Sequence, residues 1–296
     1  DSIISSGQLE QLIEDNSKCS LPQMLSTERP DKAANHLLSG RVVVIVNGSP
    51  YVLIMPCVFV DFLSSAEDPN LKFQYANLLK FVRLVAFFIT LLLPGLYVAI
   101  TNFHQEIIPT ELLFAIVASR ESVPFPIIVE ILAMEISFEL IREASLRVPS
   151  PIGTTIGIIG ALILGQAAVE ASIVSPILII IVAITGITSF AIPDFYLSFH
   201  LRIVRFLYII AGFLAGFLGI GIVLFSHLVL LCSLKSFGVS YLAPFVPATS
   251  KNNKAYFMPP FWNREKRPDF LNTKRPQKEA RISMKWKYKI GGNNGN

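Results

Sequence analysis

VPFPIIVEILAMEISFELIREASLRVPSPIGTTIGIIGALILGQAAVEASIVSP, residues 123–176, is apolar enough over most of its length to lie in lipid. Charged side chains nevertheless interrupt it at Glu130, Glu135, Glu139, Arg142, Glu143, Arg147 and Glu170. A charged residue at the centre of a membrane helix costs about 2.5–3.5 kcal/mol on insertion scales. A stretch that keeps so many charges is expected to use some of them, so we predict that it is the functional centre of an integral membrane protein.

Composition supports the membrane class. Hydrophobic residues make up 52% of the 296-residue chain, charged residues make up only 16%, and the mean hydropathy is +0.57. Soluble domains usually carry about 25% charged residues. Several apolar runs approach the roughly 20 residues that a membrane-spanning helix needs. The predicted fold class is therefore an α-helical integral membrane protein with about five to six spans or re-entrant segments.

A partial α+β soluble domain is predicted over residues 1–76. Short amphipathic helices are expected over 7–16 and 31–38. Two β-rich runs follow, joined by Asn47-Gly48, a pair that tolerates the positive φ of hairpin turns. A β-hairpin is therefore expected here. Because the chain starts at Asp1 in mid-pattern, we interpret this domain as the C-terminal part of a longer cytoplasmic domain.

The membrane domain is predicted over residues 77–248. Its expected segments are a first span at 78–100, a short interfacial or re-entrant helix within 101–123, a helix at 125–143, a span from 153, an apolar run at 177–192 and a last span at 206–234. Pro94-Gly95 is expected to kink the first span or end it early. The basic residues Lys80 and Arg83 at its start predict a cytoplasmic end.

Residues 249–296 are predicted to form a basic cytoplasmic tail. After Ser250 the chain has 12 Lys and Arg against 3 acids. Because the tail follows membrane spans, we interpret its charge by the positive-inside rule, with anionic lipid headgroups as its partner rather than nucleic acid. His200, Arg202 and Arg205 predict another cytoplasmic helix end. Five spans that start in the cytoplasm would leave the tail outside, so 106–123 or 236–248 is expected to add a crossing or a re-entrant turn.

Small residues mark one face of the helix that begins near Gly153. Gly153, Gly157, Ala161 and Gly165 recur every four residues. Small residues at this spacing let a second helix approach closely in a membrane. This face is therefore predicted to pack against neighbouring helices.

Polar residues mark nearly the opposite face of the same helix. Thr155, Gln166 and Glu170 lie there among isoleucines. Such a stripe suits a helix that lines an aqueous ion pathway, since rings of carboxylates favour cations. The alternative is a set of polar side chains that hydrogen-bond to one neighbouring helix.

Two carboxylates of the preceding helix are further candidates. Glu135 and Glu139 share a face at 100° per residue and lie deep in the apolar run. Either a wet cavity or an interhelical ion pair would explain them. Near a channel they would line a vestibule or a gate.

Enzymatic chemistry is not expected. The sequence has no phosphate-binding loop, no metal-ligand cluster and no nucleophile–base signature, so we predict no catalytic residue, metal or cofactor. The cysteines Cys19, Cys57 and Cys232 are too scattered for a disulfide framework or a metal site.

Five segments carry a resemblance to a known family: residues 27–56, 94–126 and 138–176, YLAPFVP (241–247) and PPFWNREKRP (259–268). They resemble the A subunits of the GerA family of spore germination receptors. The resemblance implies a multi-pass protein of the spore inner membrane, in complex with a transporter-like B subunit and a lipoprotein C subunit. It also implies nutrient sensing, with the nutrient bound by the B subunit. A ring of A subunits would then surround a pathway for monovalent cations.

The function expected from these observations is that of a nutrient-gated cation channel subunit. Thr155, Gln166 and Glu170 would face the ion path of a homo-oligomer. One alternative is a secondary transporter subunit with helices broken at Pro94-Gly95 and Pro176. Another is a non-conducting membrane scaffold that couples the receptor to downstream germination proteins.

Overall fold

The computed structural model describes residues 5–147, 152–248, 256–260 and 267–275. The chain divides into two compact units. The sheet unit comprises Asp1–Leu84, Pro193–Leu197 and Leu228–Asn296, and the helical unit comprises Val85–Ile192 and Ser198–His227.

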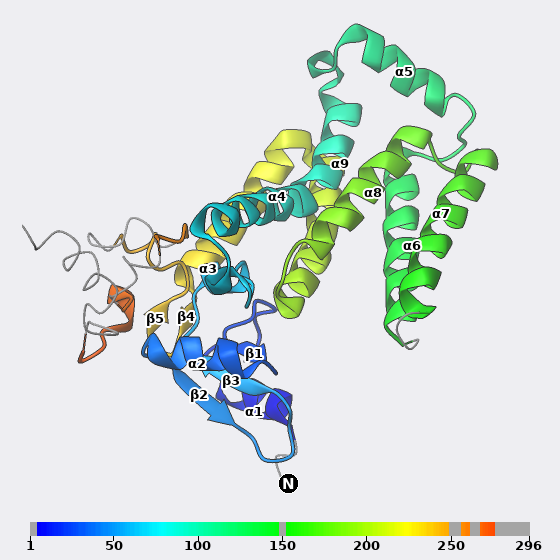
Figure 1. The fold of residues 1–296 in the computed structure, drawn as a ribbon. Helices are drawn as coiled ribbons and strands as arrows, with labels where there is room; N and C mark the ends of the chain where they lie inside the picture. The colour runs from blue at the N-terminus through cyan, green and yellow to red at the C-terminus, as the bar shows by residue number, and fades with distance from the viewer. Residues whose placement is uncertain (1–4, 148–151, 249–255, 261–266, 276–296) are drawn as a thin grey trace, which may run out of the picture. The chain divides into compact units, whose positions relative to one another are not determined.

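The sheet unit is built on a three-stranded antiparallel sheet. The strands are β1 (Leu25–Thr27), β2 (Val42–Ile45) and β3 (Val52–Met55), in the order β1-β3-β2. The helices α1 (Ser6–Ile13) and α2 (Pro30–Leu38) belong to the same unit (Figure 1). Apolar side chains of α1 pack against the buried residues Met24, Leu53 and Met55. Both predicted amphipathic helices and the predicted hairpin are confirmed.

The hairpin turn is longer than its sequence suggests. The strands end at Ile45 and resume at Val52, so residues 46–51 form the loop. Only Gly48 has a positive φ, of 86°. Pro50 has no N–H to donate to a strand ladder, which explains why β3 does not begin closer to Gly48.

The segment after the last helix returns to the sheet unit. Here the short strands β4 (Lys235–Ser236) and β5 (Val239–Ser240) pair with each other. The Ser236 hydroxyl donates to the carbonyl of Gln23 at 2.7 Å, and the Tyr241 hydroxyl donates to that of Pro22 at 2.9 Å. Both residues are fully buried. Chain segments more than 200 residues apart therefore share one core.

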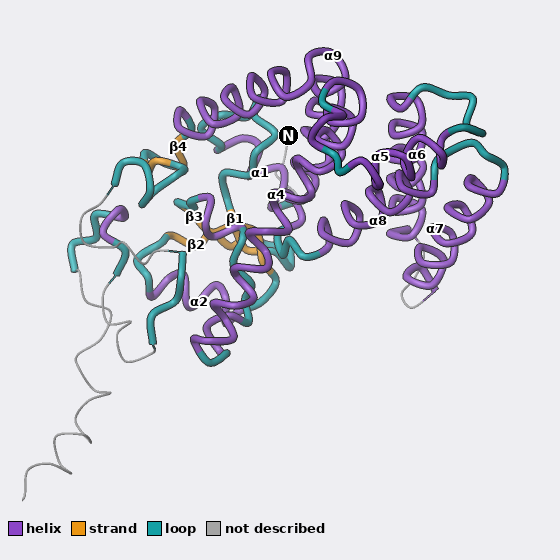
Figure 2. The backbone as a smooth tube through the Cα atoms, turned by 90° about the horizontal axis from the view of Figure 1, so that it is seen from above, coloured by secondary structure: helices purple, strands orange, loops and turns teal. Residues whose placement is uncertain are grey.

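After the short helix α3 (Phe59–Phe62), the described residues contain six longer helices: α4 (Phe73–Phe103), α5 (Thr110–Arg120), α6 (Ile127–Arg147), α7 (Ile152–Glu170), α8 (Pro176–Phe190) and α9 (Phe195–Ser233). Helix α6 packs against α7 and α8 (Figure 1), and the views agree that α6 and α7 lie side by side (Figure 2). Among the described residues, α4 and α9 are long and apolar enough to cross a membrane, and α8 is apolar but shorter.

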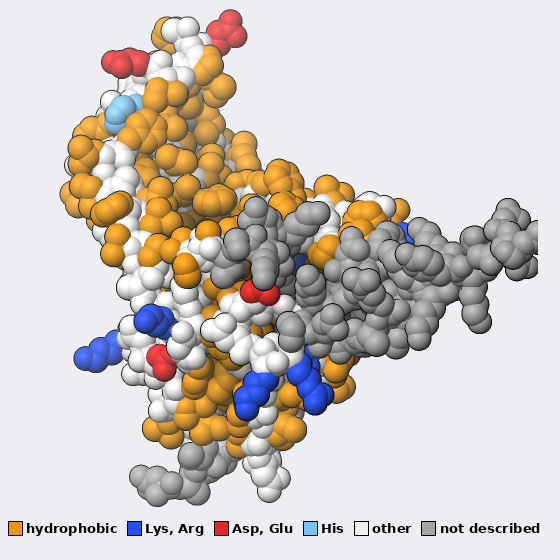
Figure 3. Space-filling model, turned by 90° about the vertical axis from the view of Figure 1, so that its left-hand side faces the viewer, with side chains coloured by type: hydrophobic (Ala, Val, Ile, Leu, Met, Phe, Trp, Pro, Cys, Tyr) orange, Lys and Arg blue, Asp and Glu red, His pale blue; other side chains and the backbone are white. Residues whose placement is uncertain are grey.

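Outward-facing side chains of the helices are largely apolar. Figure 3 shows hydrophobic side chains over much of the helical surface, with few charges among them. Leu214, Leu218, Ile222 and Phe225 are exposed on α9. Because soluble proteins rarely expose large apolar patches, this surface fits contact with lipid or with other membrane helices.

Helix α9 is two antiparallel helices rather than one. Ala215 and Gly216 have non-helical backbone angles, and Gly216 has a φ of 59°. The rings of His200 and His227 lie 5.4 Å apart, although 27 residues in a straight helix would separate them by about 40 Å. The predicted single last span at 206–234 is therefore wrong. Two helical halves, before and after Gly216, form a hairpin.

Helix α4 continues through Pro94 to Phe103. Of the two alternatives expected at Pro94-Gly95, the early end is therefore wrong, and the kink stays a prediction. A Cβ on Gly95 would lie 2.7 Å from the carbonyl oxygen of Tyr208 in α9. A Cβ on Gly212 would lie 2.6 Å from the carbonyl oxygen of Gly95. The two glycines thus mark a close backbone contact between α4 and α9, which fits the small-residue spacing at Gly212.

Candidate functional site: a buried ion cluster and a polar face of α7

Two carboxylates and two guanidinium groups meet inside the helical unit. Arg205 forms an ion pair with Glu135 at 2.6 Å and donates to Glu139 at 3.2 Å, and Arg202 donates to Glu139 at 2.8 Å. The side chains of Glu135 and Arg205 are 1% and 2% exposed, and that of Glu139 is 26% exposed. We call these four residues the ion cluster. It joins α6 to the first half of α9.

Helix geometry explains how the ion cluster forms. Glu135 and Glu139 are four residues apart, and Arg202 and Arg205 are three apart, so each pair lies on one helix face. The four formal charges cancel. Removing charges from water is costly, and close pairing offsets that cost. Of the two explanations for the carboxylates, the structure shows the interhelical ion pair.

The two arginines of the ion cluster are buried among helices of one unit. Their burial does not test the side of the membrane, so the cytoplasmic helix end expected at Arg202 and Arg205 stays a prediction. The positive-inside rule counts basic residues near helix ends and takes no account of partners elsewhere in the chain. One feature of the sequence could have predicted the ion cluster. The two arginines lie on one face near the start of a long apolar helix, and the two acids lie on one face of an earlier apolar helix.

The ion cluster is not fully satisfied. Two of its buried atoms have no hydrogen-bond partner among the described residues. Nε of Arg205 donates no hydrogen bond, and Oε1 of Glu135 accepts none. Buried charged groups without full hydrogen bonding are costly in a low-dielectric interior. Any rearrangement that supplied a further donor and acceptor would be favoured by this deficit.

A second buried acid holds one end of the helices. Arg120 of α5 donates to Glu130 of α6 at 2.9 Å. The other oxygen of Glu130 accepts the backbone N–H of Ser175 at 3.1 Å, and Ser175 caps the start of α8. A single buried carboxylate therefore ties three helices together.

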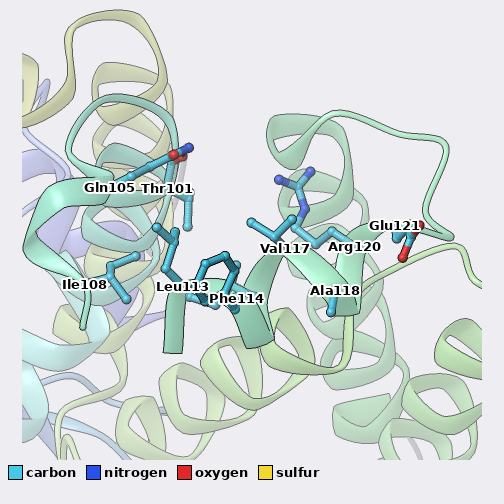
Figure 4. Close-up of a pocket in the computed structure, with 10 residues that line it drawn as sticks. Thr101, Gln105, Ile108, Leu113, Phe114, Val117, Ala118, Arg120 and Glu121 are labelled. Carbon is cyan, nitrogen blue, oxygen red and sulfur yellow. The ribbon is translucent and has the colours of Figure 1, made fainter. Parts of the chain in front are cut away.

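A cavity of about 730 Å³ lies beside this ion pair. Figure 4 shows that its wall comes from the end of α4, the following loop and α5, and includes Gln105, Phe114, Val117 and Arg120. The wall is mainly apolar, and Glu130 already holds the charge of Arg120. The cavity therefore suits an apolar group better than an ion.

The predicted pathway residues of α7 are placed differently from those of α6. Gln166 and Glu170 are exposed, and no hydrogen bond or ion pair joins either side chain to another described residue. Thr155 lies in α7, but its side chain falls outside the described part of the chain. The structure therefore brings Glu135 and Glu139 together and leaves Gln166 and Glu170 on a separate, open face.

The small residues of α7 lie against its neighbours within the chain. A Cβ on Gly157 would be 2.8 Å from the hydroxyl of Ser145 in α6, and one on Gly165 would be 3.5 Å from Ile179 in α8. Ala161 is partly buried. The surroundings of Gly153 fall outside the described residues. The packing role of this face stays a prediction for contacts between chains.

The comparisons with known proteins agree with one another. The family model described as "Bacillus/Clostridium GerA spore germination protein" matches residues 1–270. Spore germination protein KA of Bacillus subtilis (strain 168) is 50% identical over 273 residues, which are 92% of this chain and 50% of that protein. Spore germination protein GerLA of Bacillus cereus is 42% identical over 276 residues, which are 93% of this chain and 56% of that protein.

The chain belongs to the GerA family of spore germination proteins. It spans about half the length of the curated relatives it matches. No solved structure matches the chain. The family match includes both units, and the ion cluster and the polar face of α7 therefore both belong to the GerA-family part of the protein.

Proposed function

We propose that this GerA-family chain belongs to the A subunit of a nutrient receptor in the spore inner membrane. Several copies would assemble into a nutrient-gated cation channel, together with a transporter-like B subunit and a lipoprotein C subunit. Family membership and the apolar helices support a germination protein of the membrane. A nutrient bound by the receptor would shift a closed–open equilibrium by its differential affinity for the two states.

The observation that carries the channel proposal is the open polar face of α7. The buried acids of α6 already have arginine partners, as shown by Glu130 with Arg120 and Glu135 with Arg205. Gln166 and Glu170 have no such partner among the described residues. A carboxylate at a membrane surface needs water or an opposite charge. Copies of α7 around a common axis would enclose a water-filled path, and the monovalent cations in that path would supply the opposite charge.

The path would run along much of α7. Thr155 and Gln166 are 11 residues apart, which corresponds to about 16 Å along a helix. This is roughly half of the 30 Å hydrocarbon core. In this arrangement the ion cluster holds α6 and α9 behind the pathway. Glu139 is its partly exposed acid, and with Glu135 it would line a vestibule or a gate of the pathway.

Glu170→Gln in the full-length protein is expected to slow cation release after nutrient addition by about fivefold. That factor corresponds to the roughly 1 kcal/mol of attraction between unit charges 4 Å apart in water. The measurement is potassium release from spores that carry the variant at wild-type receptor level. Gln166→Leu is expected to slow release as well, because it removes a polar group from the same face.

Glu111→Gln is the matched control, since Glu111 is an exposed carboxylate of α5 rather than α7. It should release cations at the wild-type rate. Wild-type rate and selectivity in both α7 variants would contradict the pathway assignment.

We also propose that the tail lies on the same side of the membrane as the sheet unit. Both ends of the α9 hairpin, Pro193–Leu197 and the chain from Leu228 onward, belong to the sheet unit. With α4, α6, α7 and α8, the two halves of α9 would make six crossings, an even number. This agrees with the positive charge of the tail.

Labelling of Cys232 tests this topology. Cys232 is exposed near the end of α9, so an impermeant maleimide should reach it from the same side as Asn47→Cys in the β2–β3 loop. Glu106→Cys, in the exposed loop after α4, should react from the opposite side. The experiment compares sealed right-side-out and inverted vesicles. Cys232 and Asn47→Cys reacting from opposite sides would rule out the six-crossing arrangement.

A further inference from the structure

A second cavity, of about 550 Å³, lies wholly within the sheet unit. Its wall includes Glu10 of α1, Lys32 of α2, Tyr51 before β3, and Asp194 and Tyr196 at the start of α9. Small-molecule sites usually have volumes of roughly 300–1,000 Å³. The cavity therefore has room for a small organic molecule, and its lining combines carboxylates with aromatic rings and hydroxyl groups.

Glu10 is the unusual residue of this wall. It is only 7% exposed, and within the described residues no hydrogen bond or ion pair reaches its carboxylate. Burial, together with the charges of Glu14 and Asp194, raises the pKa of Glu10 to about 7. Buried carboxylates are normally paired or hydrogen-bonded. Glu10 therefore lacks a positively charged partner.

The charges around Glu10 show which kind of partner is missing. Asp194 has one carboxylate oxygen on the backbone N–H of Leu197, at 2.9 Å, where it caps α9. Burial raises its pKa too. Lys32 is the cation in the wall, and burial lowers its pKa. The three carboxylates of Glu10, Glu14 and Asp194 thus face one lysine. The negative charge around the cavity exceeds the positive charge, which favours the binding of a cation.

A bare metal ion fits this cavity poorly. Among the described residues, no group of three or more His, Cys, Asp or Glu side chains is placed to hold a metal. A protonated amine fits better, because its N–H groups can donate to two carboxylates. Tyr51 and Tyr196 also line the cavity and supply faces on which carbon atoms and a cation can rest.

We propose that this cavity is a binding site for a small organic molecule with a protonated amine, held between the carboxylates of Glu10 and Asp194. The proposal does not depend on ion conduction. Since Asp194 caps the first turn of α9, an occupied site would stabilise that cap at the start of a helix that continues into the membrane.

The test uses the full-length protein in detergent and two probes of equal size, n-butylammonium and the uncharged 1-butanol. Calorimetry should detect millimolar binding of n-butylammonium, with 1-butanol at least tenfold weaker. Because Glu10 must lose its proton, affinity for n-butylammonium should rise about tenfold between pH 6 and pH 8. Glu10→Gln should weaken binding at pH 8 by about the same factor and abolish the pH dependence.

Glu67→Gln is the matched control, because Glu67 is an exposed acid of the same unit outside the cavity wall. It should bind n-butylammonium as the wild type does. Equal binding of both probes, no binding to the full-length protein, or unchanged affinity and pH dependence in Glu10→Gln would each overturn the proposal. Cation release plays no part in this readout, so the result is separate from that for Glu170→Gln.

Discussion

Arg205→Met in the full-length protein is expected to lower the free energy of unfolding by about 3–5 kcal/mol and to remove most of the folded protein from the membrane. Arg205 is the shared donor of the ion cluster, at 2.6 Å from Glu135 and 3.2 Å from Glu139. Without it, Glu135 is left as a buried charge. Such a loss costs more than the pair contributes, because the remaining charge has been taken out of water.

A compensating change should recover most of that loss. Glu135→Leu with Arg205→Met replaces the buried pair by apolar side chains, a change that is often neutral or stabilising in proteins. Arg202 and Glu139 keep their own contact at 2.8 Å in this double variant. Fluorescence-detected size-exclusion chromatography and thermal unfolding in detergent measure both effects.

The matched control is Arg29→Met on the surface of the sheet unit. Arg29 pairs with Asp31 at 2.8 Å, but both side chains are about half exposed. Exposed ion pairs contribute little to stability because water and salt screen them, so this change should leave the folded fraction almost unaltered. If Arg205→Met were as mild as Arg29→Met, the ion cluster would not be a dry pair in the folded protein.

Local patterns in the sequence predicted much of this structure. The hairpin followed from two β-rich runs around Asn47-Gly48, and the helical segments followed from long apolar runs. Both are short-range properties, since the hydrogen bonds of a hairpin or a helix join residues that are close in the sequence. The segments expected at 101–123, 125–143 and 177–192 each correspond to a helix in the structure.

The reversal in α9 could not be seen in the same way. Hydropathy is continuous across Gly216, so no polar stretch marks a turn. The Gly212 and Gly216 pair also matches the pattern of a packing face, and both glycines are closely approached by another chain segment. What distinguishes Gly216 is a φ of 59°, a backbone angle that glycine adopts without strain. Phe103 at the end of α4 and His104 just after it, far away in sequence, lie against this position.

The ion cluster was half predicted for a related reason. The spacing of Glu135 and Glu139 indicated that these acids needed either water or partners. The partner arginines are far away in the sequence: Arg202 is 63 residues after Glu139, and Arg205 is 66 residues after it. No rule of local spacing predicts contacts over such a separation. Gln166 and Glu170 are the opposite case, since both side chains are exposed and have no partner among the described residues. Their place on an ion pathway stays a prediction.

Gly212→Val is the second change with a large expected effect. The added Cβ would lie 2.6 Å from the carbonyl oxygen of Gly95, closer than real Cβ contacts come. That oxygen belongs to the backbone of α4, so it cannot rotate away as a side chain would. The helices α4 and α9 must separate, and overpacking of this kind costs about 2–3 kcal/mol or more.

Gly221→Val is the matched control in the second half of the same hairpin. A Cβ at Gly221 meets nothing within 4 Å, so the same substitution adds an apolar side chain without a clash. Thermal unfolding of the two full-length variants in detergent should therefore differ by several degrees, with Gly212→Val the less stable. Equal melting temperatures would show that α4 and α9 do not touch at Gly95 and Gly212. The reversal at Gly216 would then lose one of the contacts that hold the first half of α9 against α4.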